Sequence, residues 1–421
     1  MKLLIVSQYF YPENFRINDI AKGLVERGHA VDVLTSLPNV PGGEFFEGYS
    51  WFSRGEKEHD GVHIERVGVI RRGSGSPARW VLNCASFAFN SLFHLPHLQK
   101  NGYDAVFVFN NSPVTKILPA KVLARRMRIP NIIYILDIWP DSMFLLLGQA
   151  EGREKTLFQR AAYGLSRWLY KSADTLLISS RGFEPKLRAM GLTAPIGYFP
   201  NYAEPPAQGG KSRTRASLSL SADDVVLAFA GNVGVAQGLD KLVEAAKTVR
   251  DARVKYLIVG DGSALAALRA QVAQAGLAQR FVFTGWVDSA EIPSYLALCD
   301  MALVSLRANG VLDLTVPAKL QTYMYAGLPV LAFMNGAGAE TVAQANCGFT
   351  ASAGDEKALA AAIDRMAALP KADREAMGER GRAYCAEHFD RDKLLDGLEA
   401  AIEKAVREYK DAECAGHHTR V

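Results

Sequence analysis

The chain has 421 residues, which is enough for two domains with full cores, and its apolar (49%) and charged (22%) contents are ordinary for a globular protein. The formal net charge of +4 is too weak a bias to indicate a nucleic-acid partner. The five cysteines form no Cys-x-x-Cys and are odd in number, which favours free thiols in a reducing compartment over a zinc site.

The first residues predict the opening of a doubly wound parallel α/β sheet. Apolar strands are expected at residues 2–7 and 30–35, with a loop at 9–14 and a helix at 17–27 between them. The first apolar run is too short for a signal peptide. Such sheets bind ligands beyond the carboxyl ends of their strands, so the loop that contains Asn14 and Arg16 is a candidate binding loop. A surface or helix-facing role for Arg16 is at least as well supported.

Residues 80–98 form the most membrane-like segment. Polar residues such as Asn83 and His94 interrupt it, and a spanning helix needs roughly 20 predominantly apolar residues, so we expect an amphipathic or core helix. A flexible stretch with Arg71, Arg72 and Arg79 precedes it. The combination fits a protein that lies on an anionic membrane, and a solvated loop fits equally well.

Two further strand ends in the first half carry polar side chains. Asn111 follows the strand expected at 104–109, and Asp137 and Asp141 follow the strand expected at 132–136. This fold class places its chemistry just past such strands. Asp141 is also placed to cap the next helix, which is the favoured interpretation for that residue.

The helix expected at 157–171 carries Arg160, Arg167 and Lys171 on one face. A basic face edged by Trp168 fits membrane docking, and an ordinary solvated face fits nearly as well. A Pro-, Gly- and Ser-rich stretch at 201–212 then predicts an interdomain linker.

The second half repeats the strand–turn–helix pattern. A strand at 225–230 leads into a turn with Gly231, Asn232, Gly234 and Gln237, and then into a helix. A glycine-rich turn that opens a helix can hold phosphate through its backbone N–H groups, although alone this signal is weak. Further strands end at Gly260 and shortly before Val287.

Residues 311–330 predict a loop, a short helix and a strand. Thr315 is a candidate cap, Pro317 suits the first turn, and Gly327 supplies a left-handed C-terminal residue. Lys319 is unusual, because a cation in the first turn opposes the helix dipole by roughly 0.3–1 kcal/mol. A lysine there makes sense where an anion such as phosphate is held; a solvated surface lysine is the alternative.

Five short motifs, Tyr-Phe-Tyr-Pro, Asp-Ile-Trp-Pro, Gly-Asn-Val-Gly, Val-Gly-Asp-Gly and Pro-Ala-Lys-Leu, occur in this order along the chain. Together they resemble the retaining GT-B glycosyltransferases of family 4, in particular the branch that builds bacterial surface polysaccharides and includes proteins described as L-fucosamine (N-acetyl-L-fucosaminyl) transferases. The resemblance implies two Rossmann-like domains facing a cleft. It implies an acceptor domain at 1–200, a nucleotide-sugar domain at 201–390, a helix at 391–410 that returns to the first domain, and a disordered tail at 411–421.

The implied activity is transfer of a sugar, N-acetyl-L-fucosamine or another N-acetylated deoxyhexosamine, from a UDP-sugar to a polyprenyl-diphosphate-linked saccharide. The resemblance also implies anomeric retention, no metal or other cofactor, no nucleic-acid partner, and a cytoplasmic location at the inner face of the plasma membrane. Two rivals remain: a nucleotide-sugar epimerase of the same fold, and a catalytically silent partner in polysaccharide assembly.

Implied donor-binding residues are Asn14, Arg16, Gly231, Asn232, Gly234, Gln237, Gly260, Val287, Thr315, Pro317, Lys319, Leu320 and Thr322. Implied acceptor-binding residues are Asn14, Asn111, Asp137 and Asp141, with Asp137 and Lys319 as the catalytic pair. The six residues proposed for membrane contact are Arg71, Arg72, Arg79, Arg160, Arg167 and Lys171.

This chain departs from the family pattern at several positions. Leu314 and Thr322 stand where the family often has paired glutamates, and Asn232 and Gln237 stand where it has arginine and lysine. Leu136 replaces a histidine before Asp137, and the first loop has no glycine. Lys319 is therefore the clearest cation for a diphosphate. In the front-face mechanism proposed for the family, the leaving phosphate oxygen deprotonates the acceptor, so the missing glutamates are not fatal to the chemistry.

Overall fold

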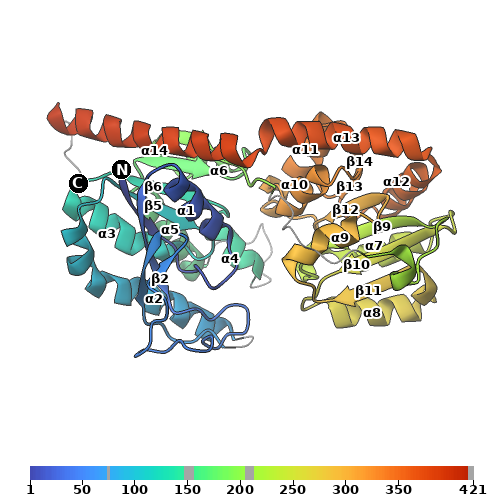
Figure 1. The fold of residues 1–421 in the computed structure, drawn as a ribbon, viewed down its shortest axis with the longest axis horizontal. Coiled ribbons are helices and arrows are strands. Elements are labelled where there is room, and N and C mark those ends of the chain that lie inside the picture. The colour runs from blue at the N-terminus through green and yellow to red at the C-terminus, as the bar shows by residue number, and fades with distance from the viewer. Residues whose placement is uncertain (74–75, 147–155, 204–212, 416–421) are drawn as a thin grey trace. The chain divides into compact units, whose positions relative to one another are not determined.

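The computed structural model describes residues 1–73, 76–146, 156–203 and 213–415. The chain forms two compact units (Figure 1): unit 1 comprises Met1–Phe199 together with Asp392–Val421, and unit 2 comprises Pro200–Arg391. Each unit contains an extended sheet of mainly parallel strands with helices packed on it. The predicted α/β class with two doubly wound sheets is confirmed.

Within the described residues, the sheet of unit 1 has the strand order β3-β4-β2-β1-β5-β6-β7-β8. All neighbours are parallel except β3, which runs antiparallel to β4. The strands are β1 (Lys2–Val6), β2 (Ala30–Ser36), β3 (Glu58–His59), β4 (Val62–Val67), β5 (Ala105–Asn110), β6 (Asn131–Ile135), β7 (Thr175–Ile178) and β8 (Ile196–Tyr198). The helices are α1 (Arg16–Glu26), α2 (Pro77–Leu98), α3 (Ile117–Met127), α4 (Asp141–Leu146), α5 (Leu157–Tyr170), α6 (Phe183–Ala189) and α14 (Arg391–Cys414).

Unit 2 has the strand order β11-β10-β9-β12-β13-β14 in the part of the chain described, and all of its neighbouring strands are parallel. The strands are β9 (Val225–Ala230), β10 (Val254–Val259), β11 (Phe281–Gly285), β12 (Met301–Ser305), β13 (Val330–Phe333) and β14 (Gly348–Ala351). The helices are α7 (Leu239–Ala246), α8 (Leu265–Gln274), α9 (Ile292–Leu296), α10 (Ala318–Tyr325), α11 (Ala337–Gln344), α12 (Glu356–Ala368) and α13 (Lys371–His388). Short 3₁₀ helices include η2 (Val114–Lys116), η4 (Val235–Gln237) and η7 (Leu312–Leu314).

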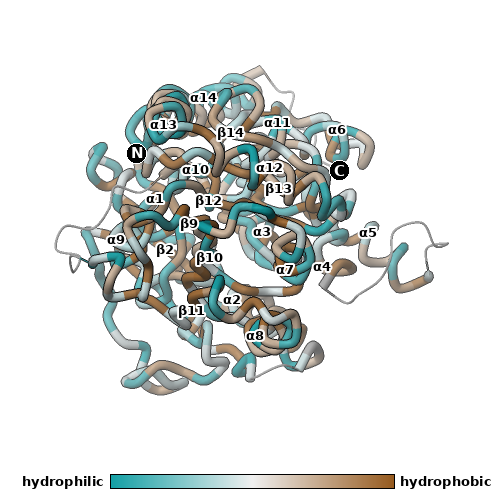
Figure 2. Tube along the Cα trace, turned by 90° about the vertical axis from the view of Figure 1, so that its right-hand side faces the viewer, coloured by the Kyte–Doolittle hydropathy of each residue, from teal (hydrophilic) through white to brown (hydrophobic). Residues whose placement is uncertain are grey.

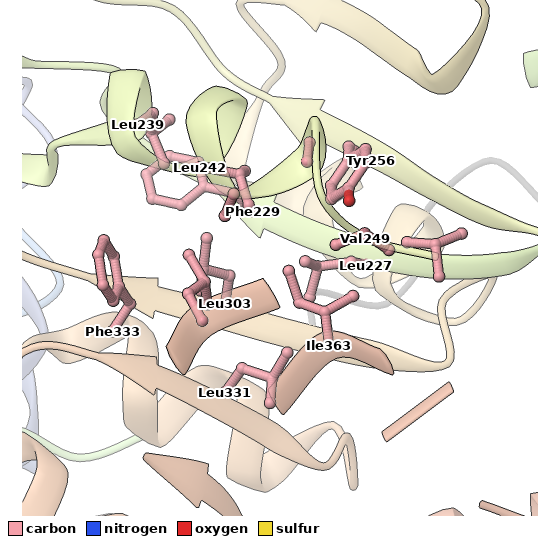
Figure 3. Packing of buried hydrophobic residues seen from close by; sticks show 14 of the residues in the cluster. Leu227, Phe229, Leu239, Leu242, Val249, Tyr256, Leu303, Leu331, Phe333 and Ile363 are labelled. Carbon is pink, nitrogen blue, oxygen red and sulfur yellow. The ribbon is translucent and has the colours of Figure 1, made fainter. Parts of the chain in front are cut away.

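Strand composition explains why both sheets are buried on two faces. β1 and β9 are almost uninterrupted runs of buried aliphatic and aromatic residues, as expected for parallel strands covered by helices on each side. In Figure 3, Phe229 of β9 lies with Leu239 and Leu242 of α7, and Leu303 and Phe333 face them from the neighbouring strands. Figure 2 shows the tube brown, that is apolar, at β10, while the outer helices α13 and α14 carry long teal stretches.

The last helix, α14, packs against unit 1 through both apolar and charged contacts. Its buried face contains Leu395, Leu398 and Ile402. On the polar side, Arg27 Nη2 lies 2.6 Å from Asp396 Oδ1, and His29 Nε2 lies 2.8 Å from Glu399 Oε1. The helix therefore belongs to unit 1 although it follows unit 2 in the sequence.

Two details differ from the sequence-based expectation. α14 continues to Cys414, so a disordered tail from residue 411 is wrong for 411–414, where Glu413 Oε1 lies 3.9 Å from Arg128 Nη1 of unit 1. Residues 416–421 lie outside the described residues, as does most of the expected linker, 204–212. The helix in the stretch 311–330 begins at Ala318, with Pro317 as its N-cap residue and no side-chain cap. Thr315 does not cap it, because its hydroxyl donates instead to Val311 O at 3.4 Å.

Candidate functional site

In unit 2, the residues that follow the carboxyl ends of β9 and β10 are in backbone-to-backbone contact. Gly231 has φ +124° and donates its N–H to Val259 O at 2.8 Å. Gly260 has φ +132°, and a Cβ added there would lie 2.1 Å from Gly231 O. Both positions therefore require glycine, and the two turns form one tightly packed edge at the point where the strand order reverses between β9 and β12.

Lys319, in the first turn of α10, reaches this edge. Its Nζ lies 4.6 Å from the centroid of the Phe229 ring, and a Cβ added to Gly231 would be 2.6 Å from the same atom. The residue is half-buried, and desolvation of its ammonium lowers the pKa of Lys319 to about 8. The ammonium makes no hydrogen bond and no ion pair with any residue that the structure describes.

A desolvated cation without a counter-charge is unfavourable, because burial penalises the charged form. The neighbouring ring face offers a cation–π contact, which compensates only in part. The first turn of α10 adds the positive end of a helix dipole. This corner of unit 2 is therefore electrostatically complementary to an anion.

The side chains of the other polar residues of the glycine turn contact the turn itself. Gln237 Oε1 accepts from Gly234 N at 3.0 Å, and the carbonyl of Gln237 accepts from Ser305 Oγ at 2.6 Å. Asn232 is exposed, and its side chain lies over Gly234. Because these amides carry no charge, a positive charge at the turn must come from other residues, of which Lys319 is one.

Arg307, which the sequence did not single out, contacts the same turn from the segment that follows β12. Its Nε donates to Val235 O at 2.8 Å, and its Nη2 lies 2.6 Å from Asp240 Oδ1. Because this arginine already has a carboxylate partner, it holds the turn in place and does not add a free charge.

The remaining predicted donor residues of unit 2 are placed unequally. Thr322 is exposed and Val287 is half-buried beside the exposed Trp286. Leu320 is fully buried in the core, and its N–H donates to Pro317 O at 2.9 Å. The structure therefore places the side chain of Leu320 in core packing and its N–H in a hydrogen bond to the chain, and its role as a donor contact stays a prediction.

In unit 1, Asp137 follows β6 and is held from the neighbouring strand end. Ser112 Oγ donates to Asp137 Oδ2 at 2.6 Å, and Trp139 Nε1 donates to Ser112 Oγ at 2.7 Å. Oδ1 of Asp137 is buried without a well-formed hydrogen bond among the described residues, although the Ser142 hydroxyl is close enough to lower the pKa of the carboxyl. Burial dominates and raises the pKa of Asp137.

Lys116, at the end of η2, is the most informative residue that the sequence did not reveal. Its side chain is completely buried, and its Nζ contacts Asn111 Oδ1 and lies 5.5 Å from the centroid of the Tyr9 ring. Burial lowers the pKa of Lys116 to about 7, and the charge of Asp137 opposes that shift. Asn111 and Asp137 are thus brought together with a cation. A lysine five residues after Asn111 in an apolar run was the available signal.

Asp141 does not join this group. Lys186 Nζ lies 3.0 Å from Asp141 Oδ1, and the Tyr163 hydroxyl donates to the same oxygen. Asp141 is the first residue of α4, and its carboxylate is bound by these two side chains of unit 1. Its selection as an acceptor contact is therefore not supported, and its position in the first helical turn suits its negative charge.

The first loop presents one buried carboxylate that the sequence did not distinguish. Glu13 Oε1 accepts from the N–H groups of Asn39 and Val40, both at 2.8 Å, and burial raises the pKa of Glu13 to about 7. Asn14 is exposed, and Arg16 is half-buried at the start of α1. Glu13 thus fixes the loop that carries these two predicted contacts.

The proposed membrane residues lie at the surface of unit 1 with one exception. Arg71, Arg79, Arg160, Arg167 and Lys171 are exposed, whereas Arg72 is half-buried. Arg71 is not a free charge, because its Nη1 lies 2.5 Å from Glu44 Oε2. Among the described residues we find no helix with the length and hydropathy of a membrane span, and the same residues contain no cluster of His, Cys, Asp and Glu arranged to hold a metal ion.

Family comparisons match each half of the chain. Residues 14–201 match the family described as "Glycosyl transferase 4-like domain", and residues 224–368 match "Glycosyl transferases group 1". WcaI of Escherichia coli (strain K12), a glycosyl transferase whose name assigns it to colanic acid biosynthesis, is 26% identical over 78% of this chain and 82% of its own length.

Two further proteins illustrate the range of similarity. A GDP-mannose-dependent alpha-(1-6)-phosphatidylinositol monomannoside mannosyltransferase of Mycolicibacterium smegmatis is 27% identical over 69% of this chain and 81% of its own length. The crystal structure of Anabaena Alr3699/HepE in complex with UDP-glucose superimposes with a TM-score of 0.70 at 17% identity, covering 96% of this chain and 100% of that chain. At this identity the structural match shows the GT-B fold alone.

Proposed function

Because the chain is a glycosyltransferase of the group 1, GT4-like type with the GT-B fold, we propose that it moves a sugar from a UDP-sugar to a lipid-linked saccharide with retention at the anomeric carbon. The sugar proposed is N-acetyl-L-fucosamine or another N-acetylated deoxyhexosamine, and the product is an intermediate of surface polysaccharide or O-antigen biosynthesis. The reaction takes place at the inner face of the plasma membrane and needs no metal.

The observation that carries this proposal is the uncompensated ammonium of Lys319. It lies beside the backbone of Gly231, at the strand-order reversal of unit 2, with no carboxylate to neutralise it. A nucleoside diphosphate supplies the missing negative charge. Charge-assisted hydrogen bonds from an ammonium to a phosphate are about twice as strong as neutral ones.

The chemistry requires stabilisation of a leaving diphosphate. The bond between the anomeric carbon and the diphosphate oxygen breaks, the bond to the acceptor oxygen forms on the same face, and the hydroxyl proton passes to the departing phosphate oxygen. Negative charge on the diphosphate grows toward the transition state, so Lys319 contributes more there than in the ground state. Asp137, on the unit proposed to bind the acceptor, orients a hydroxyl or stabilises positive charge at the sugar carbon.

The choice of substrates rests on the sequence resemblance and on the relatives. WcaI is named for colanic acid biosynthesis, and the mycolicibacterial relative is named as a mannosyltransferase of phosphatidylinositol monomannoside. That second relative is also named as dependent on GDP-mannose, whereas HepE was solved with UDP-glucose. The donor screen must therefore contain both UDP- and GDP-sugars.

The deciding experiment is a binding screen of nucleotide-sugars, followed by mass spectrometry of products on lipid-linked acceptors with and without a chelator. Transfer from a UDP-sugar that persists with chelator supports the proposal, and NMR of the product reports whether the anomeric configuration is retained. Conversion of a UDP-sugar without any acceptor would identify an epimerase. Nucleotide binding without turnover on a broad acceptor panel would identify a silent assembly partner.

A further inference from the structure

The helix α2 exposes an unbroken line of apolar residues. Six exposed positions follow one another at helical spacing along its length, and none is polar: they are Ala78, Leu82, Ala85, Phe89, Phe93 and Pro96. Phe89 is 60% and Phe93 71% exposed. We call these six residues the apolar ridge. A helix of a water-soluble domain normally turns such a stripe toward the core.

The orientation of the ridge is fixed by polar residues on the inner side of the same helix. Asn83 is fully buried, accepts from Gln8 Nε2 at 2.7 Å and donates to Ile70 O at 2.6 Å. Seven residues further on, about two helical turns, Asn90 Nδ2 donates to Gly68 O at 2.6 Å. If α2 rolled to bury the ridge, these buried polar groups would lose their partners, which is unfavourable. The ridge is therefore held outward by the packing of unit 1.

Further exposed apolar side chains lie close to α2. The connection between β2 and β4 brings Trp51 and Phe52 to the surface, with Phe52 fully exposed. Trp51 packs on Gly68, the residue whose carbonyl accepts from Asn90 of α2. An open hollow of about 380 Å³ beside them is lined by Phe45, Ser50, Trp51, Phe52, Val69, Ile70 and Arg71. In Figure 1, α2 and this blue connection lie at the same end of unit 1.

The charges on α2 and directly at its ends favour an anionic lipid surface over a protein partner of mixed charge, whereas the bordering connection carries both signs, with Glu47 and Glu56 beside Arg54 and Lys57. α2 contains no Asp or Glu. Arg79 is exposed in its first turn and Lys100 is exposed just past its end. Arg71 adds a third exposed cation, although it is paired with Glu44. Helices with an apolar outer face and basic flanks typically lie in the plane of a membrane interface.

We propose that α2 is a membrane-inserting helix: the apolar ridge and Phe52 enter the acyl region of an anionic bilayer, while Arg79 and Lys100 lie at the headgroups. This deepens the proposed function, since it specifies how unit 1 reaches a lipid-linked acceptor. The basic residues alone predict electrostatic binding to the membrane, whereas this proposal adds apolar insertion. Attraction between exposed charges is screened by salt, whereas apolar insertion persists at high ionic strength.

The test measures binding of the full chain, without nucleotide or acceptor, to vesicles of phosphatidylcholine with about a third phosphatidylglycerol, at low and high salt. Wild type is expected to bind at both salt concentrations. Phe89→Gln/Phe93→Gln should weaken binding at least about tenfold at high salt. The matched control Leu157→Gln/Phe158→Gln removes two equally exposed apolar residues from α5 and should change binding less than about twofold.

Several results would overturn the proposal. One is wild-type binding that vanishes entirely at high salt, and another is an equal loss of binding in both double variants. A lipid-free dimer that Phe89→Gln/Phe93→Gln converts to monomers would instead identify a second copy of the chain as the occupant of the ridge. Thermal unfolding verifies that each variant is folded. Because no turnover is measured, failure here leaves the transferase proposal untouched, and failure of the transferase assay leaves vesicle binding untouched.

Discussion

At the scale of single residues, the half-buried Lys319 and the buried Lys116 have different surroundings. Lys319 has no counter-charge among the described residues and lies beside the glycine turn of unit 2, so it is suited to an external anion. Lys116 is enclosed with Asn111 and Asp137 and has no access to solvent, so it acts on its protein neighbours.

Lys319→Ala should weaken binding of the nucleoside diphosphate by about tenfold or more and leave binding of the bare nucleoside nearly unchanged, because one charge-assisted contact is lost. Lys319→Arg should restore little of the affinity for the nucleoside diphosphate, since a planar guanidinium cannot replace a compact ammonium at this position. Calorimetric titration of both ligands measures the difference. Lys247→Ala, an exposed lysine of the same unit, is the control. Equal losses for the two ligands, or none, would remove Lys319 from the phosphate site.

Asp137→Asn should lower turnover much more than donor affinity. The amide keeps the size of the side chain but removes the charge that orients a hydroxyl or stabilises the sugar carbon. Steady-state kinetics on the lipid-linked acceptor, combined with donor titration, separate the two quantities. A folded Asp137→Asn protein with wild-type turnover would show that this carboxylate lies outside the chemistry.

Lys116→Met should move the acidic limb of the pH–rate profile to higher pH. The Lys116 charge lowers the pKa of Asp137, so its removal lets that pKa rise and more of the carboxyl is protonated at a given pH. Since the pKa of Lys116 is about 7, wild type also loses this charge at alkaline pH, where the two profiles should converge. The control is Lys121→Met in α3. Identical pH–rate profiles for wild type and Lys116→Met would show that the charge of Lys116 does not affect the protonation of Asp137.

At the scale of secondary-structure elements, a cluster of three histidines around Glu65 joins β4 to the C-terminal part of α2. Glu65 Oε2 lies 3.0 Å from His94 Nε2, and Oε1 lies 3.2 Å from His63 Nε2 and 3.3 Å from His97 Nε2. Hydrogen bonding from His94 is the main reason why the pKa of Glu65 falls to about 2. The cluster fixes the end of the helix whose outer line we propose to enter lipid.

This lowered pKa predicts a pH-dependent contribution to stability. The contribution of Glu65 is fully present above its unfolded pKa of about 4.5 and is lost as the pH falls toward about 2. Glu65→Gln should therefore lower the melting temperature at mildly acidic pH, and the gap to wild type should narrow as the pH falls through this window. Thermal scans across pH measure it, with the exposed Glu58→Gln as control. A difference in melting temperature that does not change with pH would show that Glu65→Gln destabilises the protein through lost packing and not through lost charge.

At the scale of the whole molecule, the two units have separate cores, and the chain contributes to unit 1 from both of its ends. Ile402 of α14 is fully buried, whereas its neighbour Glu403 is exposed. Ile402→Ala should cost about 2–5 kcal/mol of stability, because it opens a cavity under the helix. Hydrogen exchange should speed up in β1, β2 and α1, while β9–β14 keep wild-type rates.

The matched variant for that experiment is Glu403→Ala, which removes an exposed side chain from the same helical turn and should leave both units unchanged. If Ile402→Ala destabilised unit 2 as much as unit 1, the packing of α14 on unit 1 would not be its main contribution to stability. The same measurement thus assigns the helix energetically to one of the two units.

The sequence by itself determined most of the strands and helices, and the strand ends at which several candidate residues stand. Apolar runs of strand length, separated by turns and amphipathic helices, specify parallel α/β units, because a strand covered on both faces must be apolar throughout. It also placed Asp137, Asn111 and Gly231 correctly at the carboxyl ends of strands, and Lys319 in the first turn of its helix, since these features depend only on neighbouring residues.

Only the tertiary structure decided which side chains lack partners and which faces point outward. The isolation of Lys319 depends on Phe229 and Gly231, and the burial of Lys116 depends on Tyr9 and Asp137, all distant in the sequence. The periodicity of α2 could not show that its apolar line faces outward, because Asn83 finds its partners in other elements. Charge compensation and burial are properties of neighbours in space, and the local sequence does not contain them.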